Sequence, residues 1–282
     1  MNSARRLGAN VMPTCIEQRA RALLKAYRLA RPPAASRELE ERKRRFYSQF
    51  VRPGDLCIDV GANVGNRTRV LNAIGARVVA VEPQSECARA LRIAFILSPR
   101  VRVLHIALGE SQGTAEIMIA DANTLSSLSA DWVEAVVSSG RFSEAHWDTR
   151  ELVTVSTLDE LIRRYGVPRF VKIDVEGFEY EVIKGLSTPV PYLSFEFVPE
   201  YSGSAFNCVD RLSELGMSLF NFSHGESMHL AHRRWLSAAE LKDQMSELAG
   251  EGAGFGDVYA AAERAGRGST RQRANSPRRA TS

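Results

Sequence analysis

Short apolar runs alternate with amphipathic runs between residues 56 and 107, and this alternation is the feature that most restricts the fold. Each apolar run has the length of a buried strand, and each amphipathic run has the length of a helix that ends at Gly75 or before Pro99. Strands that alternate with helices form βαβ units, which place parallel strands in one sheet with helices on both faces. The predicted strands are Leu56–Val60, Arg77–Val81 and 101–107, and the predicted helices are 63–74 and 84–97.

The alternation stops between residues 109 and 155 and then resumes. Segments 114–119 and 152–155 have strand character and are expected to pair as a small antiparallel annex. The Ser-rich segment 121–150 is too long for a plain connection, so we expect it to act as a lid or to shape a substrate site. Thr157 is the expected cap of a helix over Leu158–Tyr165. The other predicted helices are 178–186, 209–215 and 236–248, and the other predicted strands are 170–175, Tyr192–Phe197, 218–222 and Gly256–Ala261.

The two ends of the chain differ in composition from its middle. Residues 1–49 are basic and are expected to form a helical extension, which includes a charged helix over 37–50, and residues 263–282 are Arg- and Ser-rich and are expected to be disordered. One α/β domain over residues 50–262 is expected between them, with 121–150 as an insertion. The net charge of +4 comes largely from the ends, so we do not expect the domain to bind nucleic acid.

The sequence gives few signs of a membrane, a metal or an oxidising compartment. No apolar run reaches the roughly 20 residues that a transmembrane helix needs, and the N-terminus lacks the apolar core of a signal peptide. We therefore expect a cytoplasmic protein, although a basic N-terminal helix can also lie on a membrane surface. The 4 cysteines and 5 histidines show no metal-binding spacing, so no metal site is expected.

A glycine turn follows the first predicted strand, and an acid ends the second. Asp59, Gly61, Asn63 and Gly65 form the turn, and Glu82 follows Asp59 by 23 residues (82 − 59). Ligands of open α/β sheets bind at the carboxyl ends of the strands, where an acid can hold two ribose hydroxyls. The G-x-G-x-x-G pattern of dinucleotide sites is absent, which favours S-adenosylmethionine, a nucleoside cofactor without phosphates. The alternative is a tight turn with an incidental acid.

Two acids follow the predicted strand at 170–175. Asp174 and Glu176 alternate with apolar residues, so they would share one face if the strand stayed extended. Such a pair can accept a hydroxyl proton as general base, hold a substrate hydroxyl or bind a divalent ion. The alternative, an acid that stabilises a helix N-terminus, would explain Glu176 better than Asp174.

Three further residues are weaker candidates for contact with a substrate. Glu196 ends the next predicted strand, where it could instead be a structural partner of Lys172 or of an arginine. His146 and Trp147 lie in the segment 121–150, where Trp147 could form an apolar wall with Trp132 and Phe142. These aromatic residues could equally form a small core of the annex.

Four segments together resemble the FkbM family of S-adenosylmethionine-dependent methyltransferases. They are Asp59-Val60-Gly61-Ala62-Asn63-Val64-Gly65, Val81-Glu82-Pro83, Thr157-Leu158-Asp159 and Lys172-Ile173-Asp174-Val175-Glu176-Gly177-Phe178-Glu179. The resemblance covers roughly residues 50–222, and the last segment is its most specific part. It implies a Rossmann-like, seven-stranded, mostly parallel sheet with one antiparallel strand, and methyl transfer to an oxygen of a sugar, glycan or natural product.

The resemblance also implies roles for individual residues. The cofactor positions are Asp59, Gly61, Asn63, Gly65 and Glu82, to which we add Pro83 and Ala107 from the neighbouring strand ends. Asp174 and Glu176 fall where the methyl group and the acceptor would meet. Two other classes stay open at this point: an NAD(P)-dependent oxidoreductase on the same fold class, and an inactive methyltransferase-like binding module. The oligomeric state is not predicted.

Overall fold

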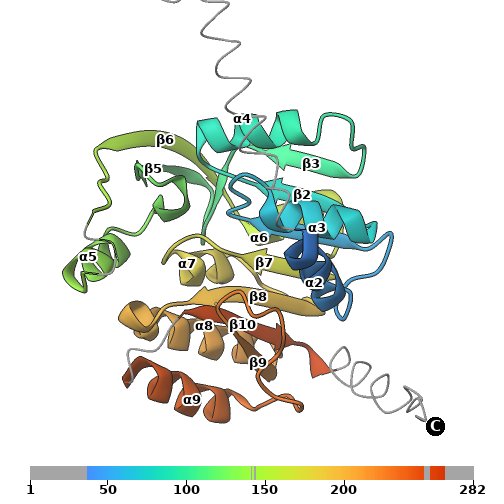
Figure 1. Ribbon diagram of the computed structural model, residues 1–282, viewed down its shortest axis with the longest axis vertical. Helices are drawn as coiled ribbons and strands as arrows, with labels where there is room; N and C mark the ends of the chain where they lie inside the picture. The colour runs from blue at the N-terminus through green and yellow to red at the C-terminus, as the bar shows by residue number, and fades with distance from the viewer. Residues whose placement is uncertain (1–36, 141, 143, 251–254, 264–282) are drawn as a thin grey trace, which may run out of the picture.

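The main sheet has seven strands in the order β3-β2-β1-β7-β8-β10-β9 (Figure 1). The computed structural model describes residues 37–140, 142, 144–250 and 255–263, so the expectations for residues 1–36 and 264–282 lie outside the described residues. Only β10 pairs in antiparallel fashion with its neighbours in this sheet. The fold class is therefore confirmed as α/β with one antiparallel strand. The strands are β1 (Leu56–Val60), β2 (Arg77–Val81), β3 (Val101–Leu104), β7 (Phe170–Ile173), β8 (Tyr192–Phe197), β9 (Leu219–His224) and β10 (Gly256–Ala261).

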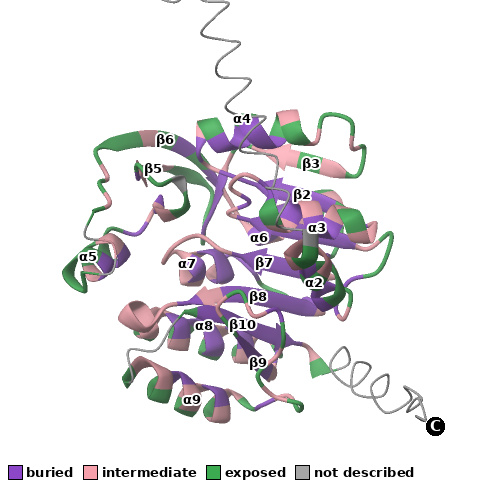
Figure 2. Cartoon of the chain, viewed as in Figure 1, coloured by how far each residue is buried: buried purple, intermediate pink, exposed green. Residues whose placement is uncertain are grey.

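Helices cover both faces of this sheet because successive strand residues point to opposite faces. On one face Val79 and Val171 pack with residues of α6 to α9, and on the other Val78 and Phe170 pack with α2 and α3. Figure 2 shows the strands as the buried centre of the molecule, with the exposed residues on the outer sides of the helices. The helices are α2 (Arg37–Tyr47), α3 (Asn66–Ile74), α4 (Ser85–Ala94), α6 (Leu158–Tyr165), α7 (Glu179–Lys184), α8 (Ser202–Glu214) and α9 (Ala238–Gly250).

A smaller sheet of three strands forms the predicted annex. β5 (Gly113–Ile119) and β6 (Thr149–Ser156) pair in antiparallel fashion as expected, and β4 (Ala107–Leu108) pairs in parallel with the other edge of β6. The prediction of one strand over 101–107 was therefore wrong. The segment between β5 and β6 is not a plain loop, because it contains the short 3₁₀ helix η2 (Asn123–Leu125) and the helix α5 (Ala130–Ser138).

The element ends differ from prediction where the backbone turns left-handed. The helix predicted over 63–74 begins at Asn66 because Gly61, Asn63 and Gly65 have φ values of 76°, 48° and 90°. The strand predicted over 170–175 ends at Ile173, before a turn in which Glu176 has φ 52°. The helix predicted over 209–215 begins earlier, at Ser202.

Helices and strands whose two ends are marked by sequence signals have the bounds that the sequence predicts. Four strands have the predicted bounds, as has α6, where the Thr157 hydroxyl accepts a hydrogen bond from the Glu160 amide. Glu160 does not complete a capping box, since its carboxylate bonds Arg163 instead. Within the described residues no helix is both long enough and apolar enough to span a bilayer.

Candidate functional site

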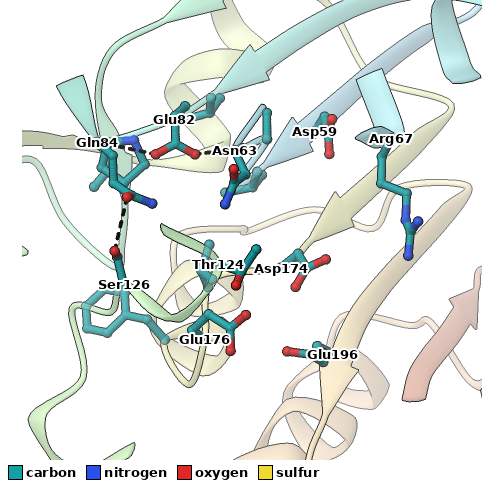
Figure 3. Close-up of a pocket in the computed structure, with 18 of the residues that line it drawn as sticks. Asp59, Asn63, Arg67, Glu82, Gln84, Thr124, Ser126, Asp174, Glu176 and Glu196 are labelled. Carbon is teal, nitrogen blue, oxygen red and sulfur yellow. Dashed lines mark hydrogen bonds between the residues drawn. The ribbon is translucent and has the colours of Figure 1, made fainter. Parts of the chain in front are cut away.

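A cavity of about 370 Å³ opens at the carboxyl ends of β1, β2, β7 and β8 (Figure 3). The chain order reverses here, since β2 lies on one side of β1 and β7 on the other, and such a switch point is where open α/β sheets bind ligands. The volume is within the range of sites for small molecules. The polar lining residues are Asp59, Asn63, Asn66, Arg67, Glu82, Gln84, Thr124, Ser126, Asp174, Glu176, Glu196 and Glu226.

The glycine turn after β1 brings backbone against the cavity. Gly61 and Asn63 line it, with φ values of 76° and 48° that turn the chain sharply out of the strand. Gly65 was expected to be a cofactor residue, but it does not line the cavity. It precedes α3, and a Cβ there would meet Leu91 and Phe95 of α4 at 2.8 Å, so this glycine allows close packing behind the cavity.

Glu82, at the end of β2, is held rigidly at the cavity wall. It is 1% exposed, and its two carboxylate oxygens each accept a backbone amide at 2.7 Å, one from Asn63 and one from Gln84. Burial raises the pKa of Glu82 to about 7, although both amides work against this rise. The Gln84 side chain also hydrogen-bonds this carboxylate, which keeps acceptor capacity for a ligand hydroxyl on the cavity side. Pro83 and Ala107, the two added cofactor candidates, line the cavity as well.

Asp59, near the end of β1, lines the cavity and is almost wholly buried. The Thr68 hydroxyl donates a hydrogen bond to one of its oxygens, so α3 fixes the direction of this carboxylate. Burial raises the pKa of Asp59, and the Thr68 hydrogen bond and the charge of Lys172 oppose the rise. This carboxylate is therefore suited to face a positively charged part of a ligand.

Three acids meet on the side of the cavity opposite Glu82, as Figure 3 shows. Carboxylate oxygens of Asp174, Glu176 and Glu196 all lie within 4.8 Å of one another. The expectation that Asp174 and Glu176 meet through an extended strand was wrong: the turn after β7 brings them together, because Glu176 is left-handed. Burial raises the pKa of Glu196 well above its usual range, and the charges of Glu176 and Asp174 add to this.

A buried acid and a buried ring hold this turn in place. The Glu179 carboxylate accepts the backbone amides of Val175 and Gly177 at 3.1 and 3.3 Å. Trp132 of α5 packs on Gly177 so closely that a Cβ atom there would lie 2.2 Å from the indole. Trp132 is 1% exposed, but it packs on the acid turn and is not part of the annex core around Ile117 and Val153. The insertion is therefore packed against the acid turn.

The insertion contributes different residues to the cavity from those expected. Thr124, Ser126 and Leu128 line it, and the Ser126 hydroxyl donates to the Gln84 side chain at 3.0 Å. His146 and Trp147 do not line the cavity: His146 is exposed, and the Trp147 indole donates to the Leu125 carbonyl at 2.8 Å. Small polar residues such as Thr124 and Ser126 carry no signal in a Ser-rich segment, so sequence reasoning missed them.

Two cations near the cavity were also missed as site residues. Lys172 is fully buried and pairs with Asp174 at 3.2 Å and Asp257 at 2.9 Å, instead of with Glu196. Arg67 of α3 binds Glu226, in the loop after β9, through two hydrogen bonds of 3.2 and 2.6 Å. Burial of Glu226 acts to raise its pKa, but Arg67 and Lys43 outweigh it and hold the value at about 2.

The charges of the lining distinguish between the two ligands considered from the sequence, S-adenosylmethionine and a dinucleotide. Six carboxyl groups line the cavity (Asp59, Glu82, Asp174, Glu176, Glu196 and Glu226), against one described cation, Arg67, which is paired with Glu226. A lining of this kind repels a pyrophosphate and attracts a cation. S-adenosylmethionine fits it, because that cofactor has a ribose diol for Glu82, a positive sulfonium and no phosphate.

Comparisons with known proteins agree with this fit. The sequence matches the methyltransferase FkbM domain over residues 59–241. No curated protein matches the chain. Among solved structures, the fold is similar to precorrin-6y C5,15-methyltransferase from Geobacter metallireducens, at 10% identity and a TM-score of 0.42, with 78% of this chain and 87% of that chain covered.

Two other solved structures are similar at the same level. One is a TehB-like S-adenosylmethionine-dependent methyltransferase from Corynebacterium glutamicum, at 9% identity and a TM-score of 0.41, with 79% of this chain and 88% of that chain covered. The other is Aeropyrum pernix fibrillarin with bound S-adenosylmethionine, at 12% identity and a TM-score of 0.41, with 75% and 68% covered. We transfer no residue or substrate at this similarity. The domain match alone spans more than half of the sequence, and the chain therefore belongs to the FkbM family of methyltransferases, with S-adenosylmethionine as its methyl donor.

Proposed function

We propose that this methyltransferase transfers the methyl group to a hydroxyl oxygen of a small sugar-like or natural-product acceptor. The observation that carries the proposal is the meeting of Asp174, Glu176 and Glu196 within 4.8 Å in the same cavity as Glu82. A hydroxyl must lose its proton to become a good nucleophile, and a carboxylate positioned beside it can take that proton. Several carboxylates in one place also suit an acceptor that presents several hydroxyls.

The chain's own residues divide the work between binding and proton transfer. Bound S-adenosylmethionine would supply an electrophilic methyl group, with a neutral thioether as its leaving group. Glu82 binds the ribose hydroxyls, and Asp59 faces the positive part of the cofactor. Asp174 accepts the proton of the acceptor hydroxyl as the oxygen–carbon bond forms, while Glu176 and Glu196 orient neighbouring hydroxyls. The apolar lining residues Ile117, Leu128 and Phe178 exclude water from this end.

The charge of the cavity supports a further restriction on the acceptor. Its one described cation, Arg67, is already paired with Glu226, so a phosphorylated or carboxylated acceptor would bring its charge against the other carboxyl groups of the lining. We therefore propose a neutral or cationic acceptor, and neither a nucleic acid nor a sugar phosphate. We also propose residues 50–262 as the methyltransferase domain, with 121–150 as the insertion that shapes the acceptor site through Thr124, Ser126 and Leu128.

A radiolabel transfer assay tests the proposal. The full chain would be incubated with methyl-labelled S-adenosylmethionine and a panel of neutral sugars, amino sugars, sugar phosphates and hydroxylated natural products. We expect transfer to a neutral or amino-sugar hydroxyl, with the methyl group located on oxygen by NMR of the product. Transfer to nitrogen or carbon would contradict the proposed chemistry. Cofactor binding without transfer to any hydroxyl would favour the alternative of a binding module.

A further inference from the structure

Strand register places polar side chains in two neighbouring rows across the carboxyl edge of the main sheet. In the first row Lys172 of β7 lies between Asp59 of β1 and Ser194 of β8, and Ser194 is paired in turn with Tyr259 of β10. In the second row Glu196 of β8 is paired with Asp257 of β10. Because residues two apart on a strand share a face, both rows lie on the same face of the sheet.

Lys172, in the first row, contacts Asp257 of the second row and Asp174 of the acid turn. Its ammonium group lies 3.2 Å from Asp174 Oδ2, 2.9 Å from Asp257 Oδ1 and 3.1 Å from the carbonyl oxygen of Ile173. The contacts with Asp257 and Ile173 are hydrogen bonds, and the contact with Asp174 is an ion pair. Lys172 is 0% exposed and does not line the cavity. Its contacts hold the ammonium at one place beside the acid turn.

Asp257 is the second anchor of this lysine and lies outside the cavity lining. It is 6% exposed, and its other oxygen accepts the Tyr259 hydroxyl at 3.3 Å. Since β10 runs antiparallel to β8, its first residues reach the carboxyl edge of the sheet, where the cavity lies. Through Lys172, an acid from the far side of β8 therefore reaches the acid turn at the cavity.

We propose that Lys172, anchored by Asp257, is a positioning residue for methyl transfer: it holds the Asp174 carboxylate by one oxygen and places a positive charge beside the acid cluster. The other Asp174 oxygen is then left to take the proton of the acceptor hydroxyl. This inference rests on the proposed function, because Asp174 is the proposed base. Lys172 itself touches neither the cofactor nor the acceptor.

The charges around Lys172 show why its ammonium matters to the cluster. Burial alone would lower the pKa of Lys172, but the charges of Asp174 and Asp257 raise it above its usual range, so the residue stays charged. The same positive charge opposes the raised pKa of Glu196. The titratable groups that face this region are Tyr47 of α2, Asp59 of β1, Arg67 of α3, Asp174 and Glu176 of the turn, Glu179 of α7, Glu196 of β8, and Asp257 and Tyr259 of β10.

Charge-balanced variants separate this role from a purely structural one. Lys172→Met alone leaves Asp257 buried without its partner and can fail to fold, so the informative pair is Asp257→Asn and the double variant Lys172→Met/Asp257→Asn. These two variants differ only at residue 172, where methionine keeps a side chain of similar length but has no ammonium group. The matched control is Lys184→Met. Lys184 lies on α7 and forms an ion pair at the surface with Glu110.

The primary measurement is the titration of Glu196 by ¹³C NMR of glutamate side-chain carboxyls, assigned with Glu196→Gln. We expect the double variant to hold the Glu196 proton to a pH at least about one unit higher than Asp257→Asn does, which is a tenfold change in ionisation. With an acceptor found by the transfer panel, we expect a drop in kcat of about tenfold or more, because the ammonium group no longer holds the Asp174 carboxylate in place. The Lys184→Met control should leave both quantities unchanged.

Equal Glu196 titrations in Asp257→Asn and the double variant would overturn the inference, and so would equal kcat values. The NMR titration needs neither cofactor nor acceptor. The radiolabel transfer assay with the wild-type protein tests the proposed function separately, so a failure of one can be told from a failure of the other.

Discussion

The carbonyl oxygen of Asp174 lies 1.8 Å from the position that a Cβ atom would take on Gly61. The two residues follow β1 and β7, which are neighbouring parallel strands, and the Asp174 amide also bonds the Val60 carbonyl at 3.0 Å. The cofactor turn and the acid turn therefore touch backbone to backbone. A shift of one turn moves the other, so the position of the proposed base depends on Gly61, the first glycine of the turn after β1.

Gly61→Ala should destabilise the protein more than an ordinary left-handed glycine does. A left-handed alanine costs roughly 1–2 kcal/mol, and forced overpacking adds roughly 1–3 kcal/mol. Gly54→Ala is the matched control, because Gly54 has φ 87° but nothing within 4 Å of an added Cβ. The free energy of unfolding in urea measures both variants. Equal losses would mean that the close approach of Asp174 to Gly61 is relaxed at no cost.

Glu82→Ala should weaken the binding of S-adenosylmethionine while the fold persists. Loss of hydrogen bonds to a charged group costs roughly 1.5–3 kcal/mol, which corresponds to a loss of affinity of about 10- to 100-fold. Isothermal titration calorimetry measures this, with Glu116→Ala in the annex as the control and NAD as the competing ligand. Unchanged affinity in Glu82→Ala would remove Glu82 from the cofactor site, and preferential binding of NAD would contradict the cofactor assignment.

Cofactor affinity should rise with pH through the pKa of Glu82, which is about 7 against a usual 4.5. Below that pH the carboxyl is protonated and is a weaker acceptor for ribose hydroxyls. The affinity should increase by up to about tenfold per pH unit from pH 5 to 7 and level off near pH 8. 5′-Methylthioadenosine is the ligand of choice, because it has the ribose hydroxyls and no amino or carboxyl group. A flat profile in wild type, or a sloping one in Glu82→Ala, would contradict this origin.

The raised pKa of Glu82 also makes the stability of the folded protein depend on pH. The folded protein keeps a proton on Glu82 that the unfolded chain releases near pH 4.5, so the contribution of Glu82 to stability is full below that pH. It is lost as the pH rises through about 7. The urea unfolding free energy should fall more from pH 4 to 8 in the wild type than in Glu82→Ala, which keeps other buried carboxyls with raised pKa values such as that of Glu179.

Asp174→Asn should reduce turnover much more than cofactor binding. General base catalysis contributes about 10²- to 10⁴-fold to a rate, and an amide cannot take the hydroxyl proton. The measurements are kcat with an acceptor found by the transfer panel and calorimetry with S-adenosylmethionine. Asp148→Asn, at an exposed position of the insertion, is the control. Wild-type turnover in Asp174→Asn would move the base to Glu176 or Glu196.

The sequence predicted those parts of the fold that depend on local pattern. β1, β2, β8, β10 and α6 have their predicted bounds because each is a short apolar run or a capped amphipathic turn that ends at a strong signal. The start of α3 and the end of β7 were misplaced because left-handed residues such as Asn63 and Glu176 carry no reliable mark in the sequence. The break between β3 and β4 was missed because the strand pattern continues across it.

The cavity was predictable in part for the same reason. Glu82 and Asp174 follow strands, and parallel strands bring their carboxyl ends to one edge, so both acids line the cavity. The Lys172–Asp257 contact joins residues 85 apart in sequence and depends on the order of strands, which local pattern does not contain. Gly65 resembles a cofactor residue in sequence but packs against α4, a role that only the helix packing reveals.

The position of β10 in the sheet determines when the sheet can be completed during synthesis. Among the described strands it is the latest in sequence, yet it lies inside the sheet, and β9 joins the sheet only through it. During synthesis from the amino end, β8 therefore keeps an open edge until residues 256–261 have left the ribosome. Until then Lys172 lacks Asp257, so a nascent chain that already contains the cofactor turn and all three acids still has an unfinished site.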